Sequence, residues 1–110
     1  MKRISYAETV FGTDDRVADL VLEYARLLAR DGASDTVTIP GRVGAGEVEP
    51  VSLLLGPASQ ITAWGEAEAF GVDAQQAIDD LDRRIRARTT VIGDSAEDPG
   101  PSLNDFDDLA

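Results

Sequence analysis

Four arginines between positions 83 and 88 form the densest group of ligand-binding side chains in the sequence. Guanidinium groups bind phosphates and carboxylates through paired hydrogen bonds, so this cluster could hold an anion or an acidic partner. Three of the arginines follow an aspartate by four residues, an order that stabilises a helix by ~0.2–0.5 kcal/mol per pair. We therefore interpret the cluster as the charged face of a helix, in which Arg88 has no such partner. The pairs are Asp79–Arg83, Asp80–Arg84 and Asp82–Arg86.

The composition excludes most catalytic mechanisms. The 110 residues include no Cys, no His and a single Lys, so cysteine nucleophiles, serine–histidine triads and metal sites built on Cys or His cannot be formed. With 21 acidic residues, chance pairs of carboxylates are certain, and no acidic loop has the spacing of a calcium site. We expect no catalytic residue, no cofactor and no metal, and predict that the chain is not an enzyme.

Two aromatic residues flank a short acidic segment and suggest an alternative function. Trp64 and Phe70, together with Glu66 and Arg42, could line a pocket that binds a small molecule or performs acid-type catalysis. This alternative requires a concave, partly apolar site that holds a carboxylate with a shifted pKa. A flat surface around Trp64 would argue against it.

The C-terminal segment concentrates the negative charge. Of the formal net charge of −11, residues 93–110 contribute six acids and no base, whereas residues 1–92 hold 15 acids and 10 bases. Its prolines and few apolar residues predict a disordered, flexible tail. Apolar residues recur at every third position among acids, a pattern that can fold onto a basic partner or onto the chain's own arginine-rich helix. The residues are Leu103, Phe106 and Leu109, with Asp105, Asp107 and Asp108 among them.

Charge and the missing catalytic groups favour a non-enzymatic protein-interaction or regulatory module, whose acidic surface and tail bind a basic protein partner. An acidic surface repels phosphate backbones, so general nucleic-acid binding is not expected. Without a secretory signal or a membrane-length apolar run, we expect a cytoplasmic protein with no membrane contact. Nine Arg against one Lys suggests a GC-rich bacterial genome. A third hypothesis is an acidic immunity protein, antitoxin or nucleic-acid mimic with one basic target.

A first helix is predicted from Asp14 to Arg30, with Thr13 as its cap. Thr13 precedes two acids, as is typical of a helix start, and Gly32 stands where a left-handed residue would end the helix. Its main apolar face is Val17, Leu20, Val21, Tyr24 and Leu28. A second apolar stripe is either covered within the fold or joins a second copy, and we predict a homodimer through it or through an exposed sheet edge. That stripe is Ala18, Leu22, Ala25 and Ala29.

Residues 35–64 predict an antiparallel meander of three short strands, because β-branched residues alternate with polar ones between glycine-containing turns. A turn at Ala45 sets apolar residues opposite each other, Val37 with Leu53 and Ile39 with Val51. The run of leucines from 53 to 55 is apolar on both faces, which would place this strand at the centre of the sheet. The third strand is predicted at 59–63, and a further short strand at 4–11.

A second amphipathic helix is predicted from Asp73, which with Gln76 has the spacing of a capping box, to about Arg88. Its apolar stripe is Ala74, Ile78, Leu81 and Ile85. The expected fold is therefore α+β in the order (β)-α-β-β-β-α, a compact domain at 1–92 followed by the tail.

Overall fold

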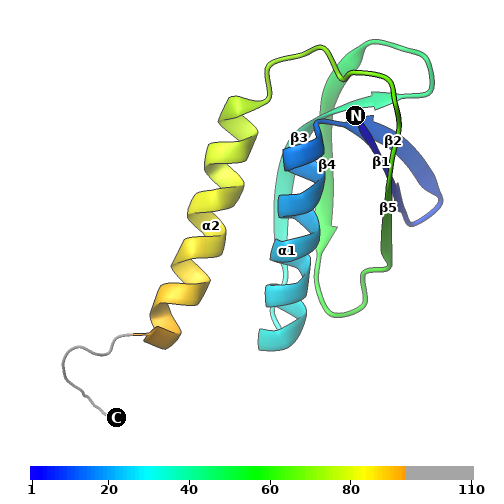
Figure 1. The fold of residues 1–110 in the computed structure, drawn as a ribbon. Helices are drawn as coiled ribbons and strands as arrows, with labels where there is room; N and C mark the ends of the chain where they lie inside the picture. The colour runs from blue at the N-terminus through cyan, green and yellow to red at the C-terminus, as the bar shows by residue number, and fades with distance from the viewer. Residues whose placement is uncertain (94–110) are drawn as a thin grey trace.

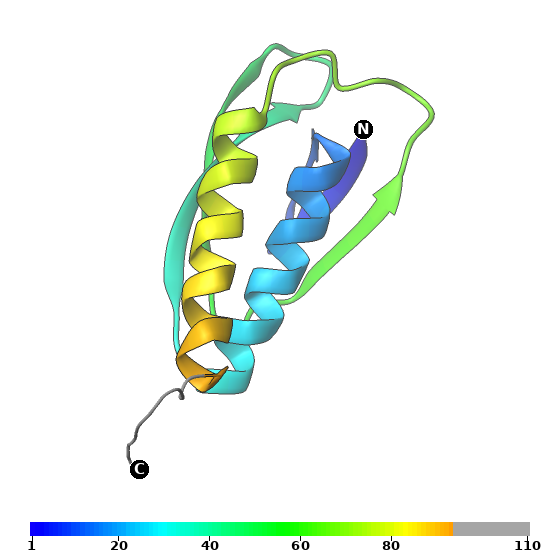
Figure 2. The same cartoon turned by 60° about the vertical axis from the view of Figure 1, so that its left-hand side comes forward.

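Two helices lie side by side on one face of a five-stranded antiparallel sheet (Figures 1 and 2). The structure is a computed structural model that describes residues 1–93, with side chains to residue 89. The predicted α+β class and order of elements are confirmed. The strands are β1 (Lys2–Tyr6), β2 (Thr9–Thr13), β3 (Asp35–Val43), β4 (Val48–Leu55) and β5 (Ile61–Gly65), and the helices are α1 (Asp15–Asp31) and α2 (Gln75–Gly93).

The segment predicted as one short strand at 4–11 is a hairpin of β1 and β2. Ile4 lies opposite Phe11, and both side chains are buried. The turn has no glycine, asparagine or proline to signal it, since Ala7 itself takes the left-handed conformation with φ 55°. This conformation costs a residue other than glycine about 1 kcal/mol. Gly12 consequently lies inside β2 rather than at the end of a strand.

The predicted register of β3 and β4 is confirmed. Val37 lies opposite Leu53, and on the other face the hydroxyls of Thr38 and Ser52 are hydrogen-bonded at 3.0 Å. Ile39 and Val51 also face each other, so the apolar residues of both strands share the face that the helices cover.

Two prolines, Pro40 and Pro50, face each other in this hairpin without weakening it. The hydroxyl of Thr13 donates to the carbonyl of Pro40 at 2.7 Å, so this carbonyl points towards β2. In an antiparallel ladder the nitrogen of a residue points the same way as its carbonyl. The pair therefore removes no hydrogen bond between β3 and β4, and the nitrogen of Pro50 faces the outer edge.

The sheet differs from the predicted meander in the position of its last strand. The strand order is β4-β3-β2-β1-β5, so β5 pairs with β1 and β4 is an edge strand. The central position predicted for β4 is wrong: Leu53 is 2 % exposed and Leu55 is fully buried, but Leu54 between them is 59 % exposed. Only one face of the sheet is covered, whereas three consecutive leucines suggested two. Pairing with β1 places Ala63 opposite Ile4 and adds β5 to the same core.

Asp14, rather than the predicted Thr13, caps α1. Its Oδ1 accepts the backbone N–H groups of Arg16 at 2.8 Å and Val17 at 3.1 Å. Thr13 is instead the last residue of β2 and is fully buried, which keeps it out of the helix. Gly32 ends α1 with φ 64°, as predicted.

The wide apolar arc of α1 is used mostly within the chain, because the helix packs on the sheet and against α2 (Figure 2). Ala18 is fully buried, and Ala25 packs against the core. Leu22 is half-buried and Ala29 is exposed. The surface part of the stripe is thus reduced to Leu22 and Ala29, and a homodimer through it stays a prediction.

The apolar stripe of α2 packs on the core as predicted, with Leu81 1 % exposed and Ala74 6 % exposed. Asp73 accepts the backbone N–H of Gln75 at 3.0 Å and so caps the helix start. The helix continues past its predicted end to Gly93, because no earlier glycine or proline stops it.

Leu53→Ala is expected to lower the free energy of unfolding by about 2–5 kcal/mol, because it opens a cavity in the core. Leu54→Ala removes the same atoms from the uncovered face and is expected to change the free energy of unfolding by less than about 0.5 kcal/mol. Urea denaturation followed by circular dichroism measures both. Equal losses would contradict one-sided coverage of the sheet.

Candidate functional site

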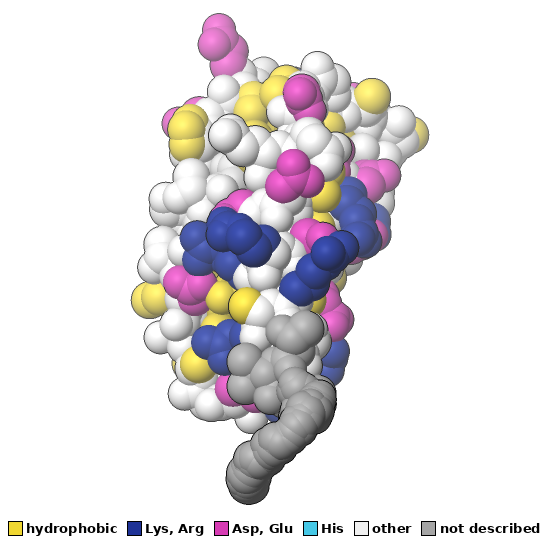
Figure 3. Space-filling view, turned by 90° about the vertical axis from the view of Figure 1, so that its left-hand side faces the viewer, with side chains coloured by type: hydrophobic (Ala, Val, Ile, Leu, Met, Phe, Trp, Pro, Cys, Tyr) yellow, Lys and Arg dark blue, Asp and Glu magenta, His cyan; other side chains and the backbone are white. Residues whose placement is uncertain are grey.

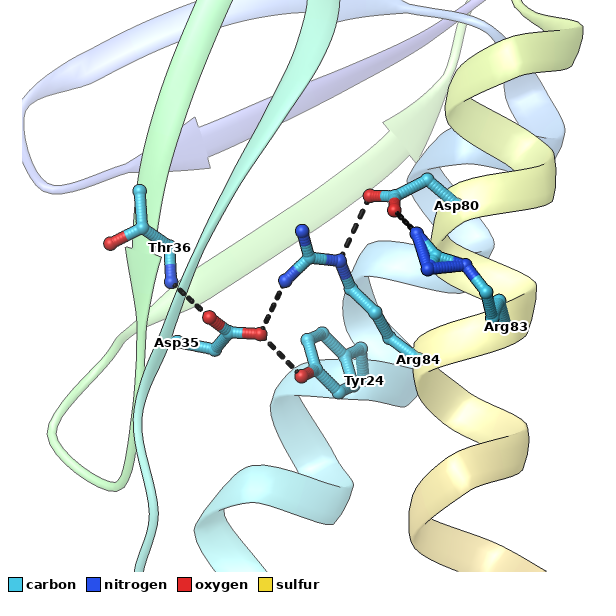
Figure 4. Close-up of polar contacts among 6 residues, drawn as sticks. All are labelled: Tyr24, Asp35, Thr36, Asp80, Arg83 and Arg84. Carbon is cyan, nitrogen blue, oxygen red and sulfur yellow. Dashed lines mark hydrogen bonds and ion pairs between the residues drawn. The ribbon is translucent and has the colours of Figure 1, made fainter.

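A polar network joins α1, β3 and α2 around the carboxylate of Asp35 (Figure 4). Tyr24 Oη and Arg84 Nη1 each donate to Asp35 Oδ2 at 2.6 Å, and the backbone N–H of Thr36 donates to Oδ1 at 2.8 Å. Arg84 Nε also donates to Asp80 at 2.9 Å. The two helices and the sheet therefore meet at one carboxylate.

These contacts keep the groups of the network in their ordinary charge states. The hydrogen bond from Tyr24, and then the one from Arg84, lower the pKa of Asp35. Burial raises the pKa of Tyr24. Burial opposes the charge of Arg84, but its bonds to Asp35 and Asp80 outweigh this effect and raise its pKa. A general acid or base needs a pKa near the working pH, so the network suits a structural tie better than proton transfer.

A second bridge between the helices lies near their C-terminal ends. Arg88 Nη1 donates to Asp31 Oδ2 at 3.0 Å, and Arg30 Nε donates to Oδ1 of the same carboxylate at 2.8 Å. Bonds to Tyr24 and Asp31 raise the pKa of Arg88. Arg88, which has no aspartate partner on its own helix, thus pairs with α1. Sequence spacing along one helix carries no signal for this contact.

The charged side chains of α2 pair along the helix, with one difference from the pairs predicted from the sequence. The pairs Asp80–Arg84 and Asp82–Arg86 form as predicted, at 2.9 Å and 3.0 Å. The predicted pair of Asp79 with Arg83 does not, because Asp79 accepts from Gln75 Nε2 at 2.9 Å and Arg83 turns to Asp80. In Figure 3, which faces α2, acidic side chains occupy the upper part of this surface and a band of basic side chains lies below them.

A groove of about 790 Å³ lies between the acidic half of α2 and the β3–β4 hairpin. We call it the acidic groove. Four carboxylates and one base line it: Glu49, Asp73, Asp79, Asp80 and Arg83. The apolar part of its lining is Ile39, Pro40, Val48, Pro50, Ala74 and Ala77. Neither half of this groove was predicted as a site, because its residues lie on two segments that only the fold brings together.

Two of the four residues predicted to form a small-molecule pocket lie together. The guanidinium of Arg42 is 5.6 Å from the ring centre of Phe70, and both line a cavity of about 810 Å³. Trp64, 40 % exposed on β5, and Glu66 are not part of its lining. Arg3, which sequence reasoning missed, lines the cavity, and its Nε is 3.9 Å from Glu66. We call this cavity, lined by Arg3, Arg42, Phe70 and residues 44–47, 68, 69 and 71, the arginine pocket.

The predicted tail contacts lie outside the described residues. They are Leu103, Asp105, Phe106, Asp107, Asp108 and Leu109. Neither helix in the described part of the chain is long and apolar enough to cross a membrane. Residues 1–93 also hold no group of three or more acidic, Cys or His side chains placed to bind a metal ion.

Asp35→Asn is expected to lower the free energy of unfolding by about 1–2 kcal/mol at pH 7, since Asp35 is 32 % exposed and its charged hydrogen bonds are partly screened. A lowered folded-state pKa stabilises the fold above the ordinary aspartate pKa of about 4, and this contribution is lost as pH falls through the folded-state value. The difference between wild type and variant should therefore shrink below pH 4 in urea denaturation. As a control, Asp82→Asn breaks a surface pair with Arg86 and should lower the free energy of unfolding by less than about 0.5 kcal/mol. An effect of Asp35→Asn that does not change with pH would contradict the role given to the Asp35 carboxylate.

Comparisons of the chain with protein-family models, with curated proteins and with solved structures return no match.

Proposed function

We propose that the chain is a non-enzymatic protein-interaction module that binds a basic segment of a partner protein in the acidic groove. The observation that carries this proposal is the charge of the groove, whose lining holds four carboxylates and one arginine. Asp80 pairs with Arg83 and Arg84, so Glu49, Asp73 and Asp79 supply the excess negative charge. Complementary charge of this kind steers a basic partner to the surface and selects against acidic ones.

The apolar lining gives a basic segment a second way to bind. Ile39 and Ala74 are buried at the base of the groove, and Val48 and Ala77 are half-buried beside them. Lysine and arginine lay their aliphatic stems on such apolar surface while the charged end reaches a carboxylate. A groove with an apolar lining and acidic sides therefore fits these side chains better than it fits short polar ones.

Two carboxylates of the groove can accept a new partner. Among the described residues, Glu49 has no hydrogen bond or ion pair. Asp79 accepts from Gln75 through one carboxylate oxygen, and its second oxygen has no bond in the described part of the chain. A cation that enters the groove thus gains contacts without first breaking an ion pair at either residue.

Recognition in the groove relies on side chains more than on strand addition. β4 borders the groove as an edge strand, and edge strands can accept an added strand. Pro50 faces outward at this edge and has no N–H to donate, which weakens a ladder at that point. Val48 and Glu49 next to it are therefore proposed to act through their side chains.

The predicted tail strengthens the same preference. Its six acids without a base add long-range attraction for a basic partner, beyond what the groove supplies. Such attraction is screened within about 8 Å at physiological salt, so association with the partner should slow as salt rises.

Titration of the full chain with a decapeptide of alternating lysine and leucine, followed by NMR amide shifts, tests the groove. Salt-sensitive shifts are expected at Val48, Ala74 and Ala77. The double variant Glu49→Gln with Asp79→Asn is expected to bind the peptide about 5–30-fold more weakly, because each lost charge contact is worth about 0.5–1 kcal/mol.

A matched double variant, Glu8→Gln with Glu23→Gln, removes the same charge outside the groove, from one exposed residue and from one half-buried residue that pairs with Arg26. Binding of this control should stay close to that of the wild type. Equal weakening of both double variants would show attraction to net charge alone, and shifts that avoid the groove would place binding elsewhere. Either result would overturn the proposal.

A further inference from the structure

The two arginines of the arginine pocket point from the same face of the sheet. Arg3 lies opposite Gly12, and Gly12 lies opposite Arg42, so the three form one row across β1, β2 and β3. Their neighbours Ile4 and Phe11 are buried under the helices, which puts the row on the uncovered face. Two strand spacings separate the Cα atoms of the arginines by about 10 Å, close enough for both side chains to reach one ligand.

Glycine at the centre of this row keeps the base of the site apolar. A Cβ at Gly12 would lie 2.4 Å from Met1 Sδ, so the side chain of Met1 occupies the place of a third side chain. The N-terminal ammonium fixes Met1 by donating to the carbonyl of Glu68 at 2.9 Å and by pairing with Asp15 at 3.0 Å. The side chain of Met1 therefore forms a fixed apolar surface between the two arginines.

Most of the hydrogen-bond donors of these arginines are not used within the described residues. Arg3 has one ion pair, from Nε to Glu66 at 3.9 Å, and Arg42 has its contact with the ring of Phe70. Stacking on an aromatic ring orients a guanidinium but leaves its N–H groups in the plane available. Both arginines can therefore donate to an oxyanion without losing these contacts.

The charges around the pocket favour a singly charged anion over a doubly charged one. Glu47 and Glu68 line the pocket with Arg3 and Arg42, so a phosphate dianion would meet two carboxylates as well as two cations. A carboxylate carries one charge and matches the planar fork of a guanidinium. Trp64, the register partner of Arg3, offers an exposed aromatic surface on the same face.

We propose that the arginine pocket binds the carboxylate of a small organic acid, whose apolar or aromatic body lies against Trp64. This site is separate from the acidic groove and opposite to it in charge preference. The site differs in two ways from the pocket predicted from the sequence. Arg3 is added as an anion-binding residue, and Glu66 pairs with Arg3 instead of lining the pocket.

Phenylacetate, acetate and inorganic phosphate, titrated into the full chain at constant ionic strength, test this site. Trp64 is the single tryptophan, so its fluorescence reports on the pocket, and the amide shifts of Gly44 and Gly71 give a second signal. Phenylacetate is expected to give a saturable change in both signals. Acetate and phosphate should bind at least about 10-fold more weakly, because they lack the aromatic body.

Arg42→Gln is expected to weaken phenylacetate binding by about 10-fold or more, since it removes a charged donor. Arg42→Lys keeps the charge but loses the planar fork, so its affinity for phenylacetate should fall between those of the wild type and Arg42→Gln. Arg16→Gln changes an exposed arginine of α1 and should bind as the wild type does.

Three results would overturn this assignment. One is a lack of saturable change with phenylacetate, and another is equal weakening by Arg42→Gln and Arg16→Gln. The third is tighter binding of phosphate, or of a synthetic peptide of residues 103–110, than of phenylacetate. The groove variant Glu49→Gln with Asp79→Asn should leave phenylacetate binding unchanged, so failure of one site can be told from failure of the other.

Discussion

The carboxylate of Asp35 joins both helices to the start of β3, on the face of the sheet where the core forms. Tyr24 of α1 and Arg84 of α2 donate to the same oxygen, each at 2.6 Å. Moving either helix away would leave a partly buried charge with a lost hydrogen bond. Both helices also bury their apolar stripes on this face, which receives the main core. The other face is left with Leu54, Trp64 and the two arginines of the pocket.

Local patterns in the sequence predicted the elements and one register well, because those depend on neighbours along the chain. The alternation around Ala45 was sufficient to pair β3 with β4. The turn at Ala7 was missed since its left-handed residue is not a glycine, and the position of β5 was missed because pairing with β1 joins segments about 60 residues apart. Leu54 shows the same limit: its apolar character could not reveal that its face has no cover.

The candidate sites were predicted only in part, for a related reason. Arg42 and Phe70 were singled out as residue types, and the fold does bring them into contact. Arg3 joins them through strand register, which the undivided strand at 4–11 concealed. The acidic groove combines a hairpin with the first turns of α2 and has no signature along the chain. The fold, rather than the sequence pattern, thus assembles both charged sites: a groove lined mainly by carboxylates, and two arginines with Glu47 and Glu68 on the uncovered face.

A photo-reactive amino acid at Gln76, an exposed residue in the lining of the acidic groove, tests most directly whether a basic segment binds there. After illumination in extracts of the producing organism, the cross-linked peptides are sequenced by mass spectrometry. The proposed function predicts peptides rich in lysine and arginine, whose recovery falls as salt is raised. Acidic or uncharged peptides, or the same peptides in equal yield from a probe at Leu54 on the uncovered face, would contradict it.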